Sequence, residues 1–239
     1  MSDFLWYGAY PAGIPHTIDP DSIANIPAIL DAAAKKFPKR TGYTNLGANL
    51  SYADAEKRSK EFAAYLQSLP ELKPGDRVAV MMPNLLQYVV AVFGILRAGM
   101  TVVNINPLYT AREVHHSLKD SGAKAIVIIE NFARTLEQAV PGTSCTRFIL
   151  TGAGDMLSFP KREIVNFMIR HVKKMVPVYK LPGAVNFRDA LSIGRSAGFR
   201  PVDVKSSDLA FLQYTGGTTG VAKGAELTHR NMIANVLQV

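Results

Sequence analysis

Residues 214–225 read Tyr214-Thr215-Gly216-Gly217-Thr218-Thr219-Gly220-Val221-Ala222-Lys223-Gly224-Ala225. The glycines let the backbone approach a ligand closely and take positive φ angles, so that several N–H groups can point at one anion. The threonine hydroxyls add neutral hydrogen-bond donors, and Lys223 adds a compact positive charge. This combination predicts a loop that binds a polyphosphate. The alternative is a flexible surface turn, but such turns rarely combine three threonines with a lysine where the glycines end.

The flanking residues predict how the loop is held. Residues 209–214 form an apolar run typical of a short buried strand, and residues 225–227 continue as a strand-like exit. Thr228 is a suitable N-cap for a helix that begins at His229. A Walker loop needs Gly-Lys-Ser/Thr at the start of a helix, whereas here Lys223 precedes a glycine. The loop does not match the dinucleotide fingerprint Gly-x-Gly-x-x-Gly either, so it is of another type.

Upstream of the loop, predicted strands and helices alternate. The expected strands are 77–82, 101–104, 125–129 and 147–150, and the expected helices are 84–98, 111–121 and 132–140. Such alternation with short loops indicates a parallel sheet that is covered on both faces. The predicted fold class is therefore α/β, with a mostly parallel sheet flanked by helices on both faces.

The N-terminal part is expected to hold helices and a hairpin. Residues 26–38 have helical periodicity, residues 41–52 alternate around Gly47 as in a hairpin, and Ser51 is suited to cap a helix that ends near Leu69. The chain is thereby divided into four segments. These are 1–75 with the N-terminal helices and hairpin, 76–152 as the α/β core, 153–190 as a basic amphipathic insert, and 205–239 as the phosphate-loop segment.

The composition excludes several classes of protein. The chain has 239 residues, of which 48% are hydrophobic and 19% charged, as is ordinary for a soluble α/β protein. No apolar run approaches the ~18 residues of a transmembrane helix, and the first residues lack the basic and apolar regions of a signal peptide. The single cysteine, Cys145, excludes an internal disulfide, suits a reducing cytoplasm, and is not expected to act as a nucleophile.

The net charge of +8 allows nucleic acid, an anionic membrane surface or anionic small molecules as partners. Six basic and two acidic residues lie between Asp155 and Lys180, which is half of the net charge. Aromatic residues are not interleaved there as a single-strand binder requires, so a nucleic-acid partner is not expected.

Residues 161–176 predict an amphipathic helix within this basic insert. Apolar residues recur at helical spacing, and the basic residues lie mostly on the other side. A helix of this kind can lie in the interface of an anionic membrane, where each basic residue contributes roughly 1 kcal/mol. The alternative is an amphipathic helix that packs on its own domain. The candidate membrane-surface residues are Lys161, Arg162, Arg170, Lys173 and Lys174.

Several other polar residues receive structural interpretations. His115 and His116 are adjacent, whereas a metal-binding pair on a helix is normally spaced i, i+4, so no metal site is predicted. His229 is close enough to the loop to reach an anion, but a role at a helix start is favoured. Tyr109 and Thr110 are expected to start a helix rather than to contact a substrate.

The loop resembles the phosphate-binding signature of the adenylate-forming superfamily, which includes acyl-CoA synthetases, luciferases and peptide-synthetase adenylation domains. With Gly217 after Gly216, and Ala222 where most members have proline, it is similar to the bacterial long-chain fatty acyl-CoA synthetases. The resemblance runs from about Trp6 to the last residue. It includes Lys73-Pro74-Gly75-Asp76-Arg77-Val78-Ala79, Met82-Pro83-Asn84-Leu85-Leu86-Gln87-Tyr88, Gly94-Ile95-Leu96-Arg97-Ala98-Gly99 and Asn104-Ile105-Asn106-Pro107-Leu108-Tyr109-Thr110.

The resemblance implies a fold and a reaction. The chain would form part of the large N-terminal domain of these enzymes, which activate long-chain fatty acids with ATP through an acyl-AMP and transfer the acyl group to coenzyme A. The loop would hold the β- and γ-phosphates, and Mg²⁺ would bridge them. Backbone N–H groups would come from Gly216, Gly217 and Gly220, hydroxyls from Thr215, Thr218 and Thr219, and the charge from Lys223.

Other motifs of the family are not found in these residues. They are the adenine-binding segment, the Tyr-Gly-x-Thr-Glu motif whose glutamate holds the metal, the ribose-binding aspartate, the small C-terminal domain with its lysine, and most of the fatty-acid tunnel. We therefore expect no catalytic residue within these 239 residues and no activity from them alone. The acyl chain length rests on the resemblance.

Two alternatives stay open at this point. One is a non-catalytic membrane-surface module that binds a nucleotide, and the other is a fatty acyl-AMP ligase that loads a carrier protein. A cytoplasmic protein associated with the inner face of the membrane is expected, with a homodimer as an open assembly state.

Overall fold

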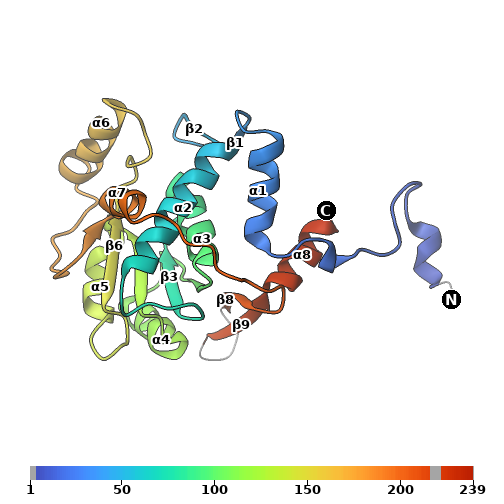
Figure 1. The fold of residues 1–239 in the computed structure, drawn as a ribbon. Helices are drawn as coiled ribbons and strands as arrows, with labels where there is room; N and C mark the ends of the chain where they lie inside the picture. The colour runs from blue at the N-terminus through green and yellow to red at the C-terminus, as the bar shows by residue number, and fades with distance from the viewer. Residues whose placement is uncertain (1–3, 216–221, 239) are drawn as a thin grey trace.

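The computed structural model describes residues 4–215 and 222–238 (Figure 1). Its strands are β1 (Thr41–Asn45), β2 (Ala48–Ser51), β3 (Arg77–Met81), β4 (Thr101–Asn104), β5 (Ala125–Ile129), β6 (Arg147–Thr151), β7 (Val185–Asn186), β8 (Leu209–Thr215) and β9 (Lys223–Thr228). Its α-helices are α1 (Ile26–Lys36), α2 (Tyr52–Ser68), α3 (Leu86–Arg97), α4 (Ala111–Ser121), α5 (Ala133–Ala139), α6 (Lys161–Phe167), α7 (Phe187–Ala197) and α8 (His229–Leu237). Shorter helical segments are η1 (Leu5–Ala9), η2 (Pro20–Ser22), η3 (Glu130–Phe132) and η4 (Met168–Val172), the last a π-helix.

Seven strands form one sheet in the order β7-β6-β5-β3-β4-β8-β9, and β1 and β2 form a separate hairpin. Neighbouring strands of the large sheet run parallel, except that β9 is antiparallel to β8. The prediction of an α/β fold with a mostly parallel sheet is confirmed.

Successive residues of the central strand pack into two different cores because side chains alternate across a sheet. Val78 and Val80 of β3 contribute to the core beneath α2, α3 and α7, whereas Ala79 and Met81 contribute to the core beneath α4 and α5. The chain moves from β3 to β4 through α3, then back across β3 to β5 through α4. Right-handed crossovers place helices on opposite faces when the direction of travel reverses. The prediction of helices on both faces is therefore confirmed.

The sequence signals for helix starts are confirmed. The Ser51 hydroxyl accepts a hydrogen bond from the Asp54 backbone N–H at 3.1 Å, so Ser51 is the N-cap of α2. Thr110 and Thr228 each form a capping box, at the starts of α4 and α8. The hairpin turn at Leu46 and Gly47 has φ angles of 50° and 70°. A cap needs only a side chain and the backbone three residues on, which is why local sequence predicts it well.

The basic insert differs from its predicted helix. Helical backbone ends at Val172, because η4 leads into Lys174, whose φ of 50° is left-handed. Beyond it the Asn131 side chain donates a hydrogen bond to the Met175 carbonyl at 3.1 Å. The prediction of helix as far as residue 176 is wrong, since this turn returns the chain toward the sheet.

Strand β7 and helix α7 were not predicted, and they close the sheet at the edge beside the insert. Residues 185–186 pair with β6 although they lie within the predicted insert. Helix α7 packs on α2 so closely that a Cβ atom added to Gly194 would lie 1.8 Å from the Glu61 carbonyl oxygen. The four segments assigned from the sequence remain predictions.

Candidate phosphate-binding site

The two strands that flank the predicted phosphate loop form an antiparallel ladder. Thr215 pairs with Lys223, and Tyr214 pairs with Gly224. The chain therefore leaves β8 and returns in β9 at directly opposite positions, as the strand-like exit predicted. The candidate residues Gly216, Gly217, Thr218, Thr219, Gly220 and Val221 lie outside the described residues.

Helix α4 contacts both sides of this ladder. The Tyr214 hydroxyl donates to Asp120 Oδ2 at 2.5 Å, and the Nε2–H of His116 donates to the Ala222 carbonyl at 3.0 Å. His116 and Asp120 are four residues apart, so they lie on one face of α4. Residues on both sides of the loop are thus held by one helix.

Tyr214 ends the buried run that the sequence predicts for residues 209–214. Its side chain is buried, and burial together with the hydrogen bond to Asp120 raises its pKa above the usual range. A Cβ atom added to Gly224 would lie 3.2 Å from the Tyr214 ring, so the glycine leaves room for this ring. In the described structure the hydroxyl of Tyr214 is directed to α4, where it supports the strand.

The remaining described candidates lie at the start of β9. Lys223 is exposed, Ala222 is partly buried, and Ala225 is exposed. An exposed ammonium group at the end of the loop is free to approach a phosphate.

A polar cavity of about 390 Å³ lies at the carboxyl ends of β3, β4 and β8. Tyr88 donates to Asn104 Oδ1 at 3.1 Å, and Asn104 Nδ2 donates to Gln213 Oε1 at 3.0 Å. Tyr214 also lines this cavity, which therefore adjoins the entry to the loop. Ligands of parallel α/β sheets bind at this edge. Sequence reasoning missed Asn104 and Gln213 as site residues, although a polar residue at the end of an apolar strand is the signal that could have found them.

The other polar residues singled out in the sequence have structural partners. The imidazole of His115 contacts the Ala139 carbonyl at 2.8 Å, and the Nδ1 atom of the buried His229 accepts from the Ile26 backbone N–H at 3.2 Å. Burial lowers the pKa of His229 to about 4, so its ring is neutral near pH 7. Burial raises the pKa of the Cys145 thiol to about 12, which is unfavourable for a nucleophile.

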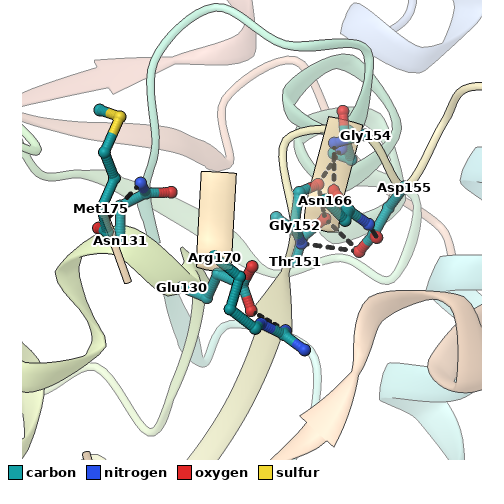
Figure 2. A network of polar contacts seen from close by, with 10 residues as sticks. Glu130, Asn131, Thr151, Gly152, Gly154, Asp155, Asn166, Arg170 and Met175 are labelled. Atoms are coloured by element: carbon teal, nitrogen blue, oxygen red, sulfur yellow. Dashed lines mark hydrogen bonds and ion pairs between the residues drawn. The ribbon is translucent and has the colours of Figure 1, made fainter. Parts of the chain in front are cut away.

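Polar contacts fasten the insert to the carboxyl end of the sheet (Figure 2). Arg170 forms an ion pair with Glu130, and Asp155 accepts hydrogen bonds from the Gly152 N–H at 2.7 Å and the Asn166 amide at 2.8 Å. Arg162 pairs with Glu163. Two of the five candidate membrane-surface cations are therefore neutralised within the molecule.

Several apolar side chains of α6 and η4 lie at the surface. No residue of α6 or η4 is buried, and Ile164, Phe167 and Val172 are 57%, 58% and 56% exposed. The apolar stripe is therefore only partly covered by the described part of the chain, since Val165 and Ile169 are half-buried. The same part of the chain contains no helix with the length and apolar character that crossing a membrane requires.

Comparisons with known proteins place this chain among relatives. A family model described as AMP-binding enzyme matches residues 30–239. The curated long-chain-fatty-acid–CoA ligases of Salmonella typhimurium and Haemophilus influenzae are each 54% identical over 98% of this chain, which spans only 42% of their length. A solved long-chain-fatty-acid-CoA ligase from Archaeoglobus fulgidus is 26% identical, with a TM-score of 0.71 over 96% of this chain and 41% of that one. The chain belongs to the AMP-binding enzyme family.

Proposed function

We propose that these residues serve an enzyme that activates long-chain fatty acids to acyl-CoA through an acyl-AMP. In the first step a carboxylate oxygen of the fatty acid attacks the α-phosphorus of ATP, and pyrophosphate leaves. In the second step the sulfur of coenzyme A attacks the acyl carbonyl, the thiol proton is lost, and AMP leaves. The observation that carries this proposal is the 54% sequence identity to two curated long-chain-fatty-acid–CoA ligases.

The part that we assign to this chain is to hold the phosphates that leave. Backbone N–H groups of Gly216, Gly217 and Gly220 and the ammonium group of Lys223 would neutralise the negative charge that develops on pyrophosphate. The antiparallel ladder of β8 and β9 supports this assignment because it fixes both ends of the loop.

The residues that the structure describes do not fit a magnesium ion held by the protein. Among residues 4–215 and 222–238, no group of three or more His, Cys, Asp or Glu side chains converges as a metal site. The carboxylate of Asp120, which lies beside the loop, already accepts a hydrogen bond from Tyr214. We therefore derive no step through the metal.

The first test is fatty-acid-dependent exchange between ATP and pyrophosphate, with palmitate as the acid. The 239-residue chain is compared with a protein in which the same residues are continued to the length of the relatives. Exchange in the longer protein alone supports the proposal and our expectation that these residues are inactive by themselves. Absence of exchange in both would contradict it.

We propose in addition that the insert docks on an anionic membrane surface, at the inner face of the cytoplasmic membrane, where fatty acids dissolve. The support is the combination of exposed apolar side chains at Ile164, Phe167 and Val172 with exposed ammonium groups at Lys173 and Lys174. Apolar groups would enter the interface while the cations face the lipid phosphates.

The two alternatives lead to different results. A fatty acyl-AMP ligase would exchange pyrophosphate but would transfer the acyl group to a carrier protein and not to coenzyme A. A non-catalytic surface module would bind anionic vesicles and ignore pyrophosphate. A homodimer is a separate proposal. The exposed rings of Phe4 and Trp6 offer a surface for it, and sedimentation equilibrium would test it.

A further inference from the structure

A basic cavity of about 690 Å³ lies beside the insert, at the edge of the sheet opposite the phosphate loop. It is bordered by the turn between β1 and β2, by α2, by the start of α6 and by α7. Figure 1 shows α7 beside β6 and α6 beyond α7, both on the side of the molecule away from β9. The basic side chains that line it are Arg58, Lys161, Arg162, Arg188 and Arg195.

Three of these cations have no carboxylate partner among the described residues. Arg162 and Arg195 form ion pairs, with Glu163 at 2.5 Å and with Glu61 at 2.8 Å. The other three are Arg58, Lys161 and Arg188. The partly buried Arg58 donates to the Met156 sulfur at 3.5 Å, which is a weak acceptor, and Lys161 donates to the Leu46 carbonyl at 2.8 Å. Arg188 is exposed on α7 and makes neither a hydrogen bond nor an ion pair with another described residue.

The two acidic residues of the lining already have donors. Asp155 accepts from the Gly152 N–H, from Thr151 Oγ1 at 3.0 Å and from the Asn166 amide (Figure 2). Asp189 accepts from the Asn186 amide at 3.3 Å. These neutral donors do not cancel the two carboxylate charges, but five cations against Asp155, Asp189 and the paired Glu61 and Glu163 still leave a net charge of +1 (five minus four). Two of the cations, Arg58 and Arg188, are guanidinium groups that suit the oxygens of a phosphate.

The surroundings of the cavity indicate where such a phosphate comes from. Lining residues Leu157 and Ser158 lead directly into Phe159, whose ring is 75% exposed, and Lys161 begins the helix that carries the exposed Ile164 and Phe167. We propose that the cavity binds the phosphate group of an anionic phospholipid headgroup. This inference rests on the proposed docking of the insert on a membrane.

The test uses the 239-residue chain and a lipid that needs no membrane. Dihexanoyl phosphatidylglycerol below its micelle concentration is titrated by calorimetry, and phosphatidylglycerol vesicles are titrated in parallel by sedimentation. Replacing both guanidinium groups, in Arg58→Gln/Arg188→Gln, should weaken binding of the soluble lipid on the order of tenfold or more. Arg112→Gln/Lys119→Gln removes two exposed charges from α4 and should leave binding unchanged. The single variant Arg188→Gln is titrated as well, because a change at an exposed position is not expected to disturb folding.

The outcomes separate the cavity from the docking of the insert. Unchanged soluble-lipid affinity in the Arg58→Gln/Arg188→Gln variant would overturn the cavity assignment, whatever the vesicles show. If inorganic phosphate binds as tightly as the soluble lipid, the proposal that the bound phosphate belongs to a lipid headgroup is overturned. Binding of the soluble lipid without binding of vesicles would support the cavity and remove the docking proposal.

Discussion

Lys223 is the first residue of β9 and lies opposite Thr215, with its side chain exposed. In a protein extended to the length of the relatives, Lys223→Ala should lower the rate of palmitate-dependent pyrophosphate exchange on the order of a hundredfold, because one strong contact to the leaving phosphates is lost. Lys35→Ala, an exposed change on α1, is the matched control. An exchange rate within twofold of the unaltered protein would remove the role assigned to Lys223.

The hydroxyl of Tyr214 contributes to stability through Asp120. Tyr214→Phe should lower the free energy of unfolding by about 1 kcal/mol, since a hydrogen bond to a charged but solvent-accessible group is lost. Urea denaturation of the 239-residue chain measures this change. Tyr52→Phe removes a hydroxyl that makes no hydrogen bond to another described residue, and it should be neutral. Equal stability of the two variants would show that the contact with α4 does not hold the strand.

At the scale of single residues, local signals predict more than distant ones. The N-caps Ser51, Thr110 and Thr228 are predicted because each acts on backbone three residues away. The contact between Asn104 and Gln213 is not predicted, since it exists only where β4 and β8 become neighbours in the sheet.

At the scale of elements, α4 shows which features the periodicity of a sequence predicts and which it does not. Its amphipathic pattern predicts its bounds and the face that packs on the sheet. The pattern does not show that His116 and Asp120 reach the residues on either side of the phosphate loop. These two contacts form because β8 and β9 extend the sheet and α4 covers one face of it beside them.

The insert offers a second test at this scale. Lys173→Glu/Lys174→Glu should weaken binding of the chain to phosphatidylglycerol vesicles by at least about tenfold, because each basic residue near an anionic surface contributes roughly 1 kcal/mol and the sign is reversed. Lys35→Glu/Lys36→Glu makes the same change of charge at exposed positions on α1. An equal loss in both variants would mean that net charge, and not the insert, determines binding.

At the scale of the whole molecule, His229 joins the start of α1 to the start of α8 through the Ile26 N–H. Burial lowers its pKa from 6.5 to about 4, while the charge of Asp208 opposes this shift. Between pH 6.5 and about pH 4, His229 binds a proton in the unfolded chain but stays neutral in the folded chain. The free energy of unfolding should therefore fall as the pH drops from about 6.5 to about 4, by an amount on the order of 2–3 kcal/mol.

Urea denaturation between pH 4 and 7.5 measures this dependence. His229→Gln provides an amide oxygen that can still accept from Ile26 but cannot titrate, so its stability should vary less across the same range. A pH dependence identical to that of the unaltered chain would assign the effect to other groups.

The sequence by itself determined the α/β class, the alternation of strands and helices and most helix starts, and its glycines, threonines and lysine predict a phosphate-binding loop. Each of these depends on residues close together in the chain. Only the tertiary structure decided the strand order, the contact of Tyr214 with Asp120, the exposure of Ile164, Phe167 and Val172 in the insert, and the cavity that gathers Arg58, Lys161 and Arg188. These features join segments that are distant in sequence, and strand pairing and helix packing alone bring them together.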